Sequence, residues 1–551
     1  MRPTDTGDLW WKTAVVYCLD VETFMDGNDD GTGDFEGLAH RIDYLAELGV
    51  TCLWLMPFYP TPGRDDGYDI VDFYGVDPRL GHHGDLVEVI RTAKDRGIRV
   101  IADLVVNHTS DQHPWFKASR SSRTSPYRDF YIWRDEVPKD APTSVFPGEE
   151  NGVWQLDEKT GQYYLHNFYH HQPDLNLANP RVRDEIAKVI GFWMQVGLSG
   201  FRVDAVPFLE QSDPDVDAHE LLRSLRKYLS RRSGDSVLLG EVNLPYEQQL
   251  AFFGGDAADE LSMQFDFIGM QNLYLSLARQ DARPLAAALA ERPALVEESQ
   301  WANFVRNHDE LTLDKLTESQ RQEVFTAFAP DEGMRVYNRG ITRRLPPMLG
   351  GDPRHVRMVY SLLFSLPGTP VLYYGEEIGM GENLDQPGRL AVRTPMQWNS
   401  TANGGFSRAR PRRLAAAVTT GGYGPEHVTV AAQREDPTSL LHFVELLIRR
   451  YRASAEIGWG ALTIIEHDTD SVLVHALQGP QGRMIAVHSF SAEPQTIEFA
   501  LPEGVQPGTE LTDLLREGGV TADDRGRVAL SLDAYDHRWL RVREAGDRRL
   551  S

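Results

Sequence analysis

The stretch Gly200-Phe-Arg-Val-Asp204 is a short apolar, β-rich segment that ends in an aspartate, with an arginine two residues before it. Side chains two residues apart on a strand point to the same face, so Arg202 and Asp204 lie on one side of the predicted strand. Three other apolar stretches also end in polar side chains, at His108, Glu241 and Asp309. Polar residues at the C-terminal ends of several buried strands are typical of a (β/α)8 barrel active site.

Eight such apolar stretches recur along the chain, and most are followed by a helical pattern. Several are apolar on both faces, which is typical of parallel strands covered by helices. Eight β-then-α units predict an α/β protein with a (β/α)8 TIM barrel. The predicted strands are 14–19, 51–56, 99–105, 200–203, 236–240, 262–267, 301–305 and 370–374. Helical patterns between them include 35–48, 85–96, 182–196 and 219–232.

Two regions depart from this alternation. Residues 109–180 are rich in proline, aromatic and charged residues and are far longer than an ordinary loop. They predict an inserted subdomain after the third strand, over the mouth of the barrel. After a helical stretch at 439–453, alternating segments predict a C-terminal β-sandwich. We therefore expect a catalytic barrel of residues 1–108 and 181–455, an inserted domain of 109–180 and a C-terminal domain of 456–551.

The charge of the chain limits its partners. Its 551 residues carry 56 Lys+Arg against 81 Asp+Glu, a net charge of −25. Surfaces that bind nucleic acid or anionic membranes need clustered positive charge, so we expect neither partner. The net charge neither favours nor disfavours a neutral small-molecule sugar as partner. The sequence leaves a homo-oligomer open.

The N-terminal residues and the cysteines point to a cytoplasmic protein. Residues 1–11 lack the apolar core of a signal peptide, and no apolar run approaches the roughly 20 residues that cross a bilayer. The only cysteines, Cys18 and Cys52, each fall within a predicted strand. Two cysteines in so long a chain make no disulfide scaffold, so we expect small core residues.

The carboxylates at the strand ends suit cleavage of a glycosidic bond. One carboxyl group, kept protonated in a less polar environment, donates to the leaving oxygen, and the other attacks the sugar. A retaining enzyme needs the two about 5–5.5 Å apart, a spacing that neighbouring strand ends supply. Arg202, on the same face as Asp204, keeps that carboxylate ionised as a nucleophile requires.

These segments resemble a known family. In chain order, Asp103-Leu-Val-Val-Asn-His108, Gly200-Phe-Arg-Val-Asp204, Gly240-Glu241 and Asn307-His308-Asp309 resemble the four signature regions of the α-amylase family, glycoside hydrolase family 13. Gln172-Pro-Asp-Leu-Asn176 looks like its fifth region, in the form found in oligo-1,6-glucosidases. The resemblance implies a barrel with an inserted domain after the third strand and a C-terminal β domain.

The resemblance also assigns roles to residues. It implies that Asp204 is the nucleophile, that Glu241 is the acid/base, and that Asp309 grips sugar hydroxyls. Spacing from Tyr68 favours Asp65 over Asp66 as the aspartate of the first subsite. The implied substrate-contacting or positioning residues are Asp65, Tyr68, His108, Gln172, Arg202, His308 and Arg393.

A loop near the N-terminus carries oxygen ligands at alternate positions, as a calcium loop does: Asp26-Gly-Asn-Asp-Asp-Gly-Thr-Gly-Asp34. It is not an EF-hand, because the twelfth position is Gly37. It is similar to a structural Ca²⁺ loop of the family, and the implied ligands are Asp26, Asn28, Asp30, Thr32 (by its carbonyl) and Asp34. A turn without metal remains the alternative interpretation of this loop. The sequence also leaves undecided whether Asn107 and Asp174 form a second metal site.

Within the family, residues 338–349, 363–375, 377–381 and 393–406 look most like the trehalose synthase branch. That branch isomerises maltose and trehalose: the glucosyl unit stays on the nucleophile while the released glucose turns and attacks. Residues 19–24 and 242–267 depart from it, so a hydrolytic exo-acting α-glucosidase remains the alternative. Ala205 stands where a valine is associated with α-1,6 preference, which disfavours isomaltose.

Overall fold

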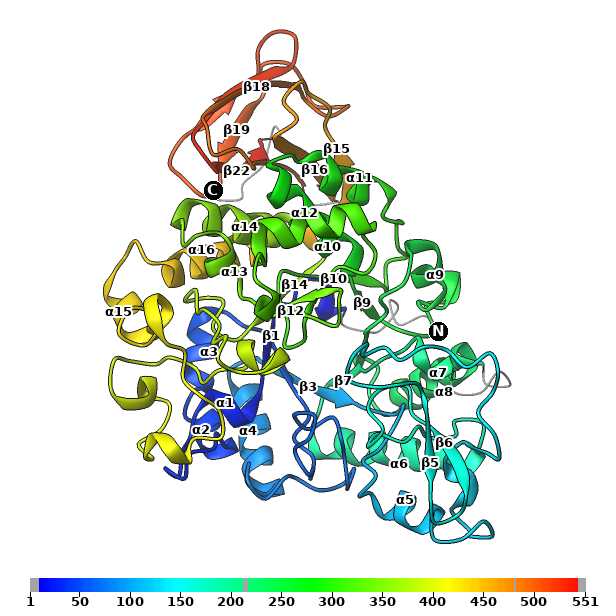
Figure 1. Ribbon diagram of the computed structural model, residues 1–551. Coiled ribbons are helices and arrows are strands. Elements are labelled where there is room, and N and C mark those ends of the chain that lie inside the picture. Colours follow the sequence, from blue (N-terminus) through cyan, green and yellow to red (C-terminus); the bar gives the residue numbers. More distant parts are fainter. Residues whose placement is uncertain (1–8, 212–216, 480–481, 544–551) are drawn as a thin grey trace.

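The computed structural model describes residues 9–211, 217–479 and 482–543. Its centre is a closed barrel of eight parallel strands that follow one another in chain order (Figure 1). The strands are β1 (Val16–Leu19), β2 (Cys52–Leu55), β3 (Arg99–Leu104), β7 (Gly200–Val203), β8 (Val237–Gly240), β9 (Met263–Phe265), β10 (Gln300–Phe304) and β14 (Thr369–Tyr373). The barrel prediction and all eight predicted strands are confirmed.

Helices surround the barrel as expected. They include α4 (His83–Asp95), α6 (Pro180–Val196), α8 (Ala218–Ser230), α10 (Phe267–Arg279), α14 (Pro353–Ser365) and α16 (Leu440–Arg452). One predicted helix, 35–48, is instead two, α2 (Phe35–Ala39) and α3 (Ile42–Leu48). The break falls where the backbone of Arg41 leaves the α conformation, at φ −108° and ψ 0°. Cys18 and Cys52 are free and buried in β1 and β2, as predicted.

The segment after β3 forms a small lobe of its own. It contains α5 (Pro114–Ser119) and an antiparallel sheet in the order β4 (Trp133–Arg134), β6 (Gln162–Leu165), β5 (Trp154–Asp157). Ile132, Val153 and Leu165 form its separate apolar cluster. Isolated antiparallel bridges pair His108 with Asp174 and Tyr131 with Leu175. They hold the last residues of the lobe next to its first residues, at the barrel mouth.

The C-terminal residues form two sheets that share a core. The larger holds β15 (Ala461–Ile464), β16 (Val472–Gly479), β17 (Gly482–Ser489), β22 (His537–Val542), β19 (Glu510–Asp513) and β20 (Gly519–Thr521). The smaller pairs β18 (Gln495–Ala500) with β21 (Arg527–Leu532). Side chains of both sheets, such as Val487 and Phe499, belong to one buried cluster, as in a sandwich.

The search for membrane-spanning helices covers the described ranges 9–211, 217–479 and 482–543. Within them, every helix is too short or too polar to cross a bilayer. Residues 1–8, most of the segment on which the signal-peptide prediction depends, lie outside the described residues.

Candidate active site

The three predicted carboxylates come from the C-terminal ends of β7, β8 and β10. The parallel register pairs Val203 with Gly240, so Asp204 and Glu241 follow side by side on neighbouring strands. Arg202 lies between them: Nη1 donates to Asp204 Oδ1 at 2.5 Å and Nη2 to Glu241 Oε2 at 2.7 Å. The backbone N–H of Ala205 donates to the same Glu241 oxygen at 3.2 Å. One buried guanidinium therefore fixes both carboxylates of the reacting pair.

Asp103 completes this arrangement, and the sequence reasoning gave it no role. It pairs in register with Arg202 and contacts Arg202 Nη1, while Trp54 Nε1 donates to its other oxygen at 2.7 Å. Its side chain is fully buried. The available signal was an acid inside an otherwise apolar strand, which is unusual unless that acid is paired. Asp103 is a positioning residue that holds Arg202.

The environment raises the pKa of both reacting carboxyl groups. Burial is the largest effect on Asp204, Arg202 opposes it, and the resulting pKa is about 6. Burial also dominates at Glu241, where Arg202 opposes it and the negative charges of Asp204 and Asp309 add to it, which gives a pKa of about 7. Near neutral pH Asp204 is therefore the more ionised member of the pair, and Glu241 is the member that retains more of its proton.

We expect a narrow, bell-shaped pH dependence of kcat/KM. The rate falls as the pH drops through about 6 because Asp204 takes up a proton, and it falls as the pH rises through about 7 because Glu241 loses one. The two midpoints are properties of the coupled pair. Initial rates on maltose, whose leaving oxygen needs a proton, measure the profile from pH 4 to 9. A flat profile between pH 5 and 8 would contradict these assignments.

Asp309 stays ionised for a different reason. Burial acts to raise its pKa, but Arg389, His308 and Arg393 outweigh that effect and hold the pKa well below the ordinary value. Its Oδ1 lies 2.9 Å from Arg389 Nη1 and 3.2 Å from Arg393 Nη2. Such a permanently ionised carboxylate is suited to accept hydrogen bonds from sugar hydroxyls.

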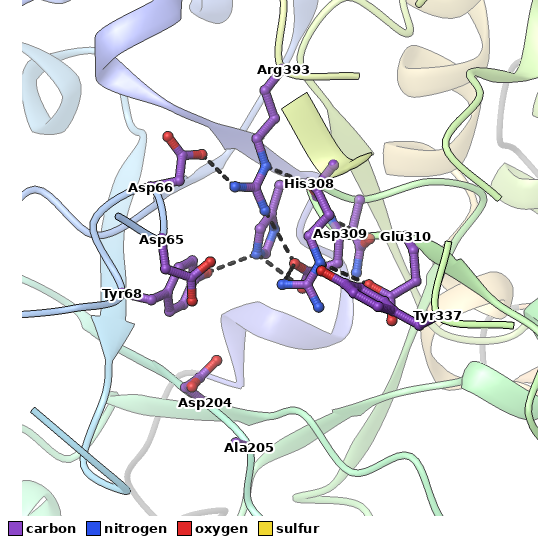
Figure 2. A network of polar contacts seen from close by, with 12 residues as sticks. Asp65, Asp66, Tyr68, Asp204, Ala205, His308, Asp309, Glu310, Tyr337 and Arg393 are labelled. Carbon is purple, nitrogen blue, oxygen red and sulfur yellow. Dashed lines mark hydrogen bonds and ion pairs between the residues drawn. The ribbon is translucent and has the colours of Figure 1, made fainter. Parts of the chain in front are cut away.

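The floor of the site is aromatic. The rings of Tyr68 and His308 are parallel, with centroids 5.5 Å apart, and the Tyr68 hydroxyl lies 2.7 Å from His308 Nε2 (Figure 2). His108 Nε2 lies 3.2 Å from the carbonyl oxygen of Tyr68. Burial lowers the pKa of His108 to about 3, so its ring is neutral. All three residues are buried, and Tyr68 and His108 line the cavity.

The two candidate aspartates of the first subsite have different neighbours. Asp65 lines the cavity and accepts a hydrogen bond from Gln172 Nε2 at 2.7 Å. Asp66 instead pairs with Arg393 Nη1 at 2.7 Å (Figure 2). Arg393 also donates from Nε to the carbonyl oxygen of His308 at 2.8 Å. The same guanidinium therefore contacts His308, Asp309 and Asp66. Thus Asp65 faces the cavity and Asp66 holds Arg393.

A cavity of about 330 Å³ contains the carboxylates, and its rim joins two distant segments. Phe146 of the inserted lobe packs between Tyr169 and Tyr337, with ring centroids at 4.4 and 4.7 Å. The hydroxyls of Tyr169 and Tyr337 lie 2.8 Å apart. The Arg389 guanidinium lies 5.3 Å from the Phe146 ring centroid. We call Phe146, Tyr169, Tyr337 and Arg389 the rim cluster; none was singled out from the sequence.

The residue after the nucleophile is strained. Ala205 has φ 49°, a left-handed value that costs a non-glycine residue about 1 kcal/mol or more. It lines the cavity beside Asp204, and its N–H is the donor to Glu241. The turn therefore aims one backbone N–H at the acid/base.

The predicted calcium ligands are only partly brought together. Asp26 and Asp34 are buried, and the N–H of Asn28 lies 3.1 Å from Asp26 Oδ1 and 3.3 Å from Asp34 Oδ2. Asn28 and Asp30 are exposed, and each accepts the N–H two residues further on, at 2.9 and 2.8 Å. Among the described residues, no group of three acidic, histidine or cysteine side chains has metal-binding geometry.

The second candidate metal pair does meet. Asn107 Nδ2 donates to Asp174 Oδ1 at 3.2 Å, and the N–H of Asn167 donates to the same oxygen at 3.1 Å. Burial raises the pKa of Asp174 to about 8, and both of its oxygens accept hydrogen bonds, from Asn107 and Asn167. The pair alone supplies too few oxygen ligands for Ca²⁺.

A parallel barrel whose mouth holds two carboxyl groups of unequal pKa, with one arginine between them, has the groups that a retaining glycoside-acting enzyme needs. The alpha amylase catalytic-domain family matches residues 20–329 and 341–460, and a sucrose hydrolase-like C-terminal domain matches 482–541. The chain therefore belongs to the α-amylase family.

Similar proteins refine this placement. The chain is 40% identical to a trehalose synthase of Pimelobacter sp. (strain R48), over 97% of this chain and 96% of that protein. It is 31% identical to an oligo-1,6-glucosidase of Parageobacillus thermoglucosidasius, over 90% and 93%. A solved structure of an inactive double mutant of MutB in complex with isomaltulose has a TM-score of 0.78 at 26% identity, covering 98% of this chain and 100% of that chain.

Proposed function

We propose that the protein isomerises maltose and trehalose by moving a glucosyl unit from one hydroxyl of glucose to another. Asp204 attacks the anomeric carbon while Glu241 protonates the leaving oxygen, which gives a glucosyl-enzyme and free glucose. The glucose turns in the cavity, Glu241 takes the proton of a different hydroxyl, and that oxygen displaces Asp204. The relative named trehalose synthase, at 40% identity over nearly the whole chain, supports this outcome.

The observation that carries the proposal is a set of contacts between two segments at the rim of the cavity. The rim cluster joins the inserted lobe to the loop before β13 (Gly340–Ile341), and Arg339 Nη1 donates to the carbonyl oxygen of Val145 at 2.7 Å. Arg389 pairs with both Asp309 and Glu310, at 2.9 and 2.8 Å. We infer that these contacts narrow the opening of a space of about 330 Å³, which favours retention of a released monosaccharide and limits the entry of water.

The test separates isomerase from hydrolase. The enzyme is incubated with maltose, and separately with trehalose, in the presence of excess uniformly ¹³C-labelled glucose, and products are followed by chromatography and mass spectrometry. We expect each disaccharide to form the other, largely without label, because the released glucose stays in the cavity. Glucose as the sole product would overturn the proposal and identify an α-glucosidase, the activity type to which the oligo-1,6-glucosidase relative points.

Opening the rim should divert the glucosyl unit to water. In Tyr337→Ala, the stacking on Phe146 and the contact with Tyr169 are both lost. An aromatic pair contributes about 0.5–1.5 kcal/mol, so we expect the ratio of hydrolysis to transfer to rise roughly 3- to 10-fold. The ratio of glucose to isomerised disaccharide measures this. Tyr337→Phe, which keeps the ring, is the matched control and should remain close to wild type; an unchanged product ratio in Tyr337→Ala would argue against the rim.

We also propose that the loop 26–34 holds a structural Ca²⁺ ion. Two buried carboxylates, Asp26 and Asp34, lie on either side of the Asn28 N–H, and among the described residues neither has an ion pair. Their oxygens accept backbone N–H groups, including those of Asp29, Gly31 and Gly37, so the loop would rearrange around a divalent cation, which would offset the repulsion between the two carboxylates. Asn28, Asp30 and the Thr32 carbonyl would supply the remaining oxygens. The ion would stabilise the fold and take no part in the chemistry.

Chelation tests the calcium site. With the ion at 100 times its dissociation constant, binding contributes about 2.7 kcal/mol, which for this chain length corresponds to a rise in Tm of about 2 °C. Protein stripped with EDTA should regain that difference with Ca²⁺ and less of it with Mg²⁺. Asp26→Asn keeps an oxygen in place but removes a charge, and should not respond. An unchanged Tm after stripping, with no calcium detected by metal analysis, would reject the site.

The proposal includes a cytoplasmic location. It is supported by Cys18 and Cys52, which are free thiols in neighbouring parallel strands. Fractionation of cells that express the natural gene, with antibody detection, tests it. Recovery outside the cytoplasm would reject this part without affecting the chemistry.

A further inference from the structure

Three histidines form a row on the face of the C-terminal sheet that packs against α14 (Figure 1). His488 of β17 lies directly opposite His537 of β22 in the antiparallel register. The ring of His488 is also nearly parallel to that of His475 of β16, with centroids 6.0 Å apart. We call His475, His488 and His537 the histidine row. Each ring can take up a proton near neutral pH, so the row places three titratable groups at the junction between two domains.

The contacts with α14 suit the neutral form of the two fully buried rings, His475 and His488. His475 Nε2 lies 2.9 Å from the carbonyl oxygen of Ser365, which can only accept, so this nitrogen carries the proton. His488 Nε2 lies 3.0 Å from Ser361 Oγ, which also accepts the indole N–H of Trp539 at 3.0 Å. Among the described residues, the buried Nδ1 atoms of both rings have no hydrogen-bond partner. In the charged form of either ring, Nδ1–H is therefore a buried donor without an acceptor.

The charged groups around the two buried rings do not offset a positive charge. Burial is the largest effect on His475; the carbonyl of Ser365 opposes it and Arg292 adds to it, which gives a pKa of about 4. At His488, burial and the neighbouring His475 and His537 hold the pKa well below its ordinary value. Among the described residues, no carboxylate acts on either ring. A proton on one ring makes a proton on the next ring less favourable while the junction stays closed.

The acids at the edge of the junction are paired with arginines. His537 is half-buried at the end of the row. The charged groups that act on it are Arg516, Asp536 and Arg357. Asp536, the one acid among them, pairs with Arg516. Further along β22, Arg541 Nη2 lies 3.0 Å from Glu456 Oε1. Both acids are therefore already engaged by arginines.

We propose that the histidine row is an acid-operated latch: the C-terminal domain stays on α14 while the rings are neutral and is released when they take up protons. In the open state the rings lie in water, where a histidine has a pKa of about 6.5. Below that pH the open form binds more protons than the closed form, so a falling pH favours opening. The stability of the closed junction is fully present above about pH 6.5 and is lost progressively as the pH falls toward about 4, the pKa of His475.

The latch is separate from the carboxylates of the active site. Asp204 and Glu241 follow the C-terminal ends of barrel strands. The row instead contacts Ser361 and Ser365, at the end of α14 that leads into the start of β14. Acid therefore acts on the protein at two separate places, and opening of the latch is measured without any substrate. The proposal does not depend on which glucoside the enzyme uses.

Hydrogen exchange of the wild-type protein tests the latch. Exchange is followed by mass spectrometry in peptides that cover α14 and β17, corrected for the intrinsic effect of pH, and converted to the ratio of open to closed molecules. The two buried rings alone should raise this ratio roughly 50-fold between pH 6 and pH 5, while peptides that cover β3 keep their protection. Equal protection of α14 and β17 at both pH values would overturn the proposal. An equal loss in β3 would show unfolding of the whole chain and would also overturn it.

Substitutions locate the effect. His475→Gln/His488→Gln keeps two polar side chains that do not titrate, so the rise between pH 6 and pH 5 should shrink to less than about tenfold. The matched control, His40→Gln/His427→Gln, removes two exposed histidines and should keep the full rise. The single variants His475→Gln and His488→Gln disturb packing less, and each should remove a factor of about seven. A rise equal to that of wild type in the single or double variants of the row would refute the latch.

Discussion

Asp204→Ala should lose at least roughly five orders of magnitude in kcat, as expected when the nucleophile of a covalent mechanism is removed. Asp204 lies at the end of β7, and its Oδ1 accepts a hydrogen bond from Arg202 Nη1 at 2.5 Å. Without it no glucosyl-enzyme forms, so isomerisation and hydrolysis disappear together. Steady-state rates on maltose and burst kinetics on an aryl α-glucoside measure the loss.

The controls separate chemistry from folding. Asp204→Asn keeps shape and hydrogen bonding to Arg202 but cannot form a stable glycosyl ester, so it should be nearly as inactive as Asp204→Ala. Both variants should keep the wild-type circular dichroism spectrum and bind maltose by calorimetry. Turnover within tenfold of wild type in either variant would refute the nucleophile assignment.

Glu241→Gln should lower kcat by about 10²- to 10⁴-fold, the usual contribution of a positioned proton donor. The pKa of about 7 at Glu241 produces the alkaline limb of the pH profile, so that limb should disappear in the variant while the acid limb near pH 6 remains. The loss should be smallest for substrates whose leaving group needs no proton.

A pair of substrates tests this selectivity. On a dinitrophenyl α-glucoside, whose leaving group is a stable anion, formation of the glucosyl-enzyme should be nearly normal in Glu241→Gln, and azide should then speed its breakdown. On maltose the full loss should appear. An equal loss on both substrates, with the alkaline limb intact, would show that Glu241 acts only through structure.

Much of the fold follows from local pattern. Each barrel strand is a short apolar run, and a run buried on both faces is visible without knowledge of its neighbours, as at 99–105. In the C-terminal domain, 510–513 and 519–521 were not predicted as strands, because they are short and only part of each faces the core. Their pairing depends on β22, another strand that the sequence analysis did not identify.

The catalytic residues were predictable because strand-end chemistry is local. The rim cluster was not, since Phe146, Tyr169 and Tyr337 meet only through contacts between segments far apart in the chain. Asp103 was visible as a buried acid, yet its partner Arg202 lies 99 residues away. Such roles depend on residues that come together only when the barrel closes. The hydrophobic periodicity of the sequence does not reveal these pairs.

Barrel closure also constrains how the chain is made. β1 pairs with β2 and with β14, so its second edge stays uncovered until residues near 371 have been synthesised. The segment before β1 also lacks a partner until later residues are synthesised, because the Lys12 ammonium donates to the carbonyl oxygen of Ser299 at 3.0 Å. A nascent chain that stalls before β14 therefore exposes an apolar strand edge to other chains. The barrel can therefore close only after β14 has been synthesised and can pair with both β1 and β10.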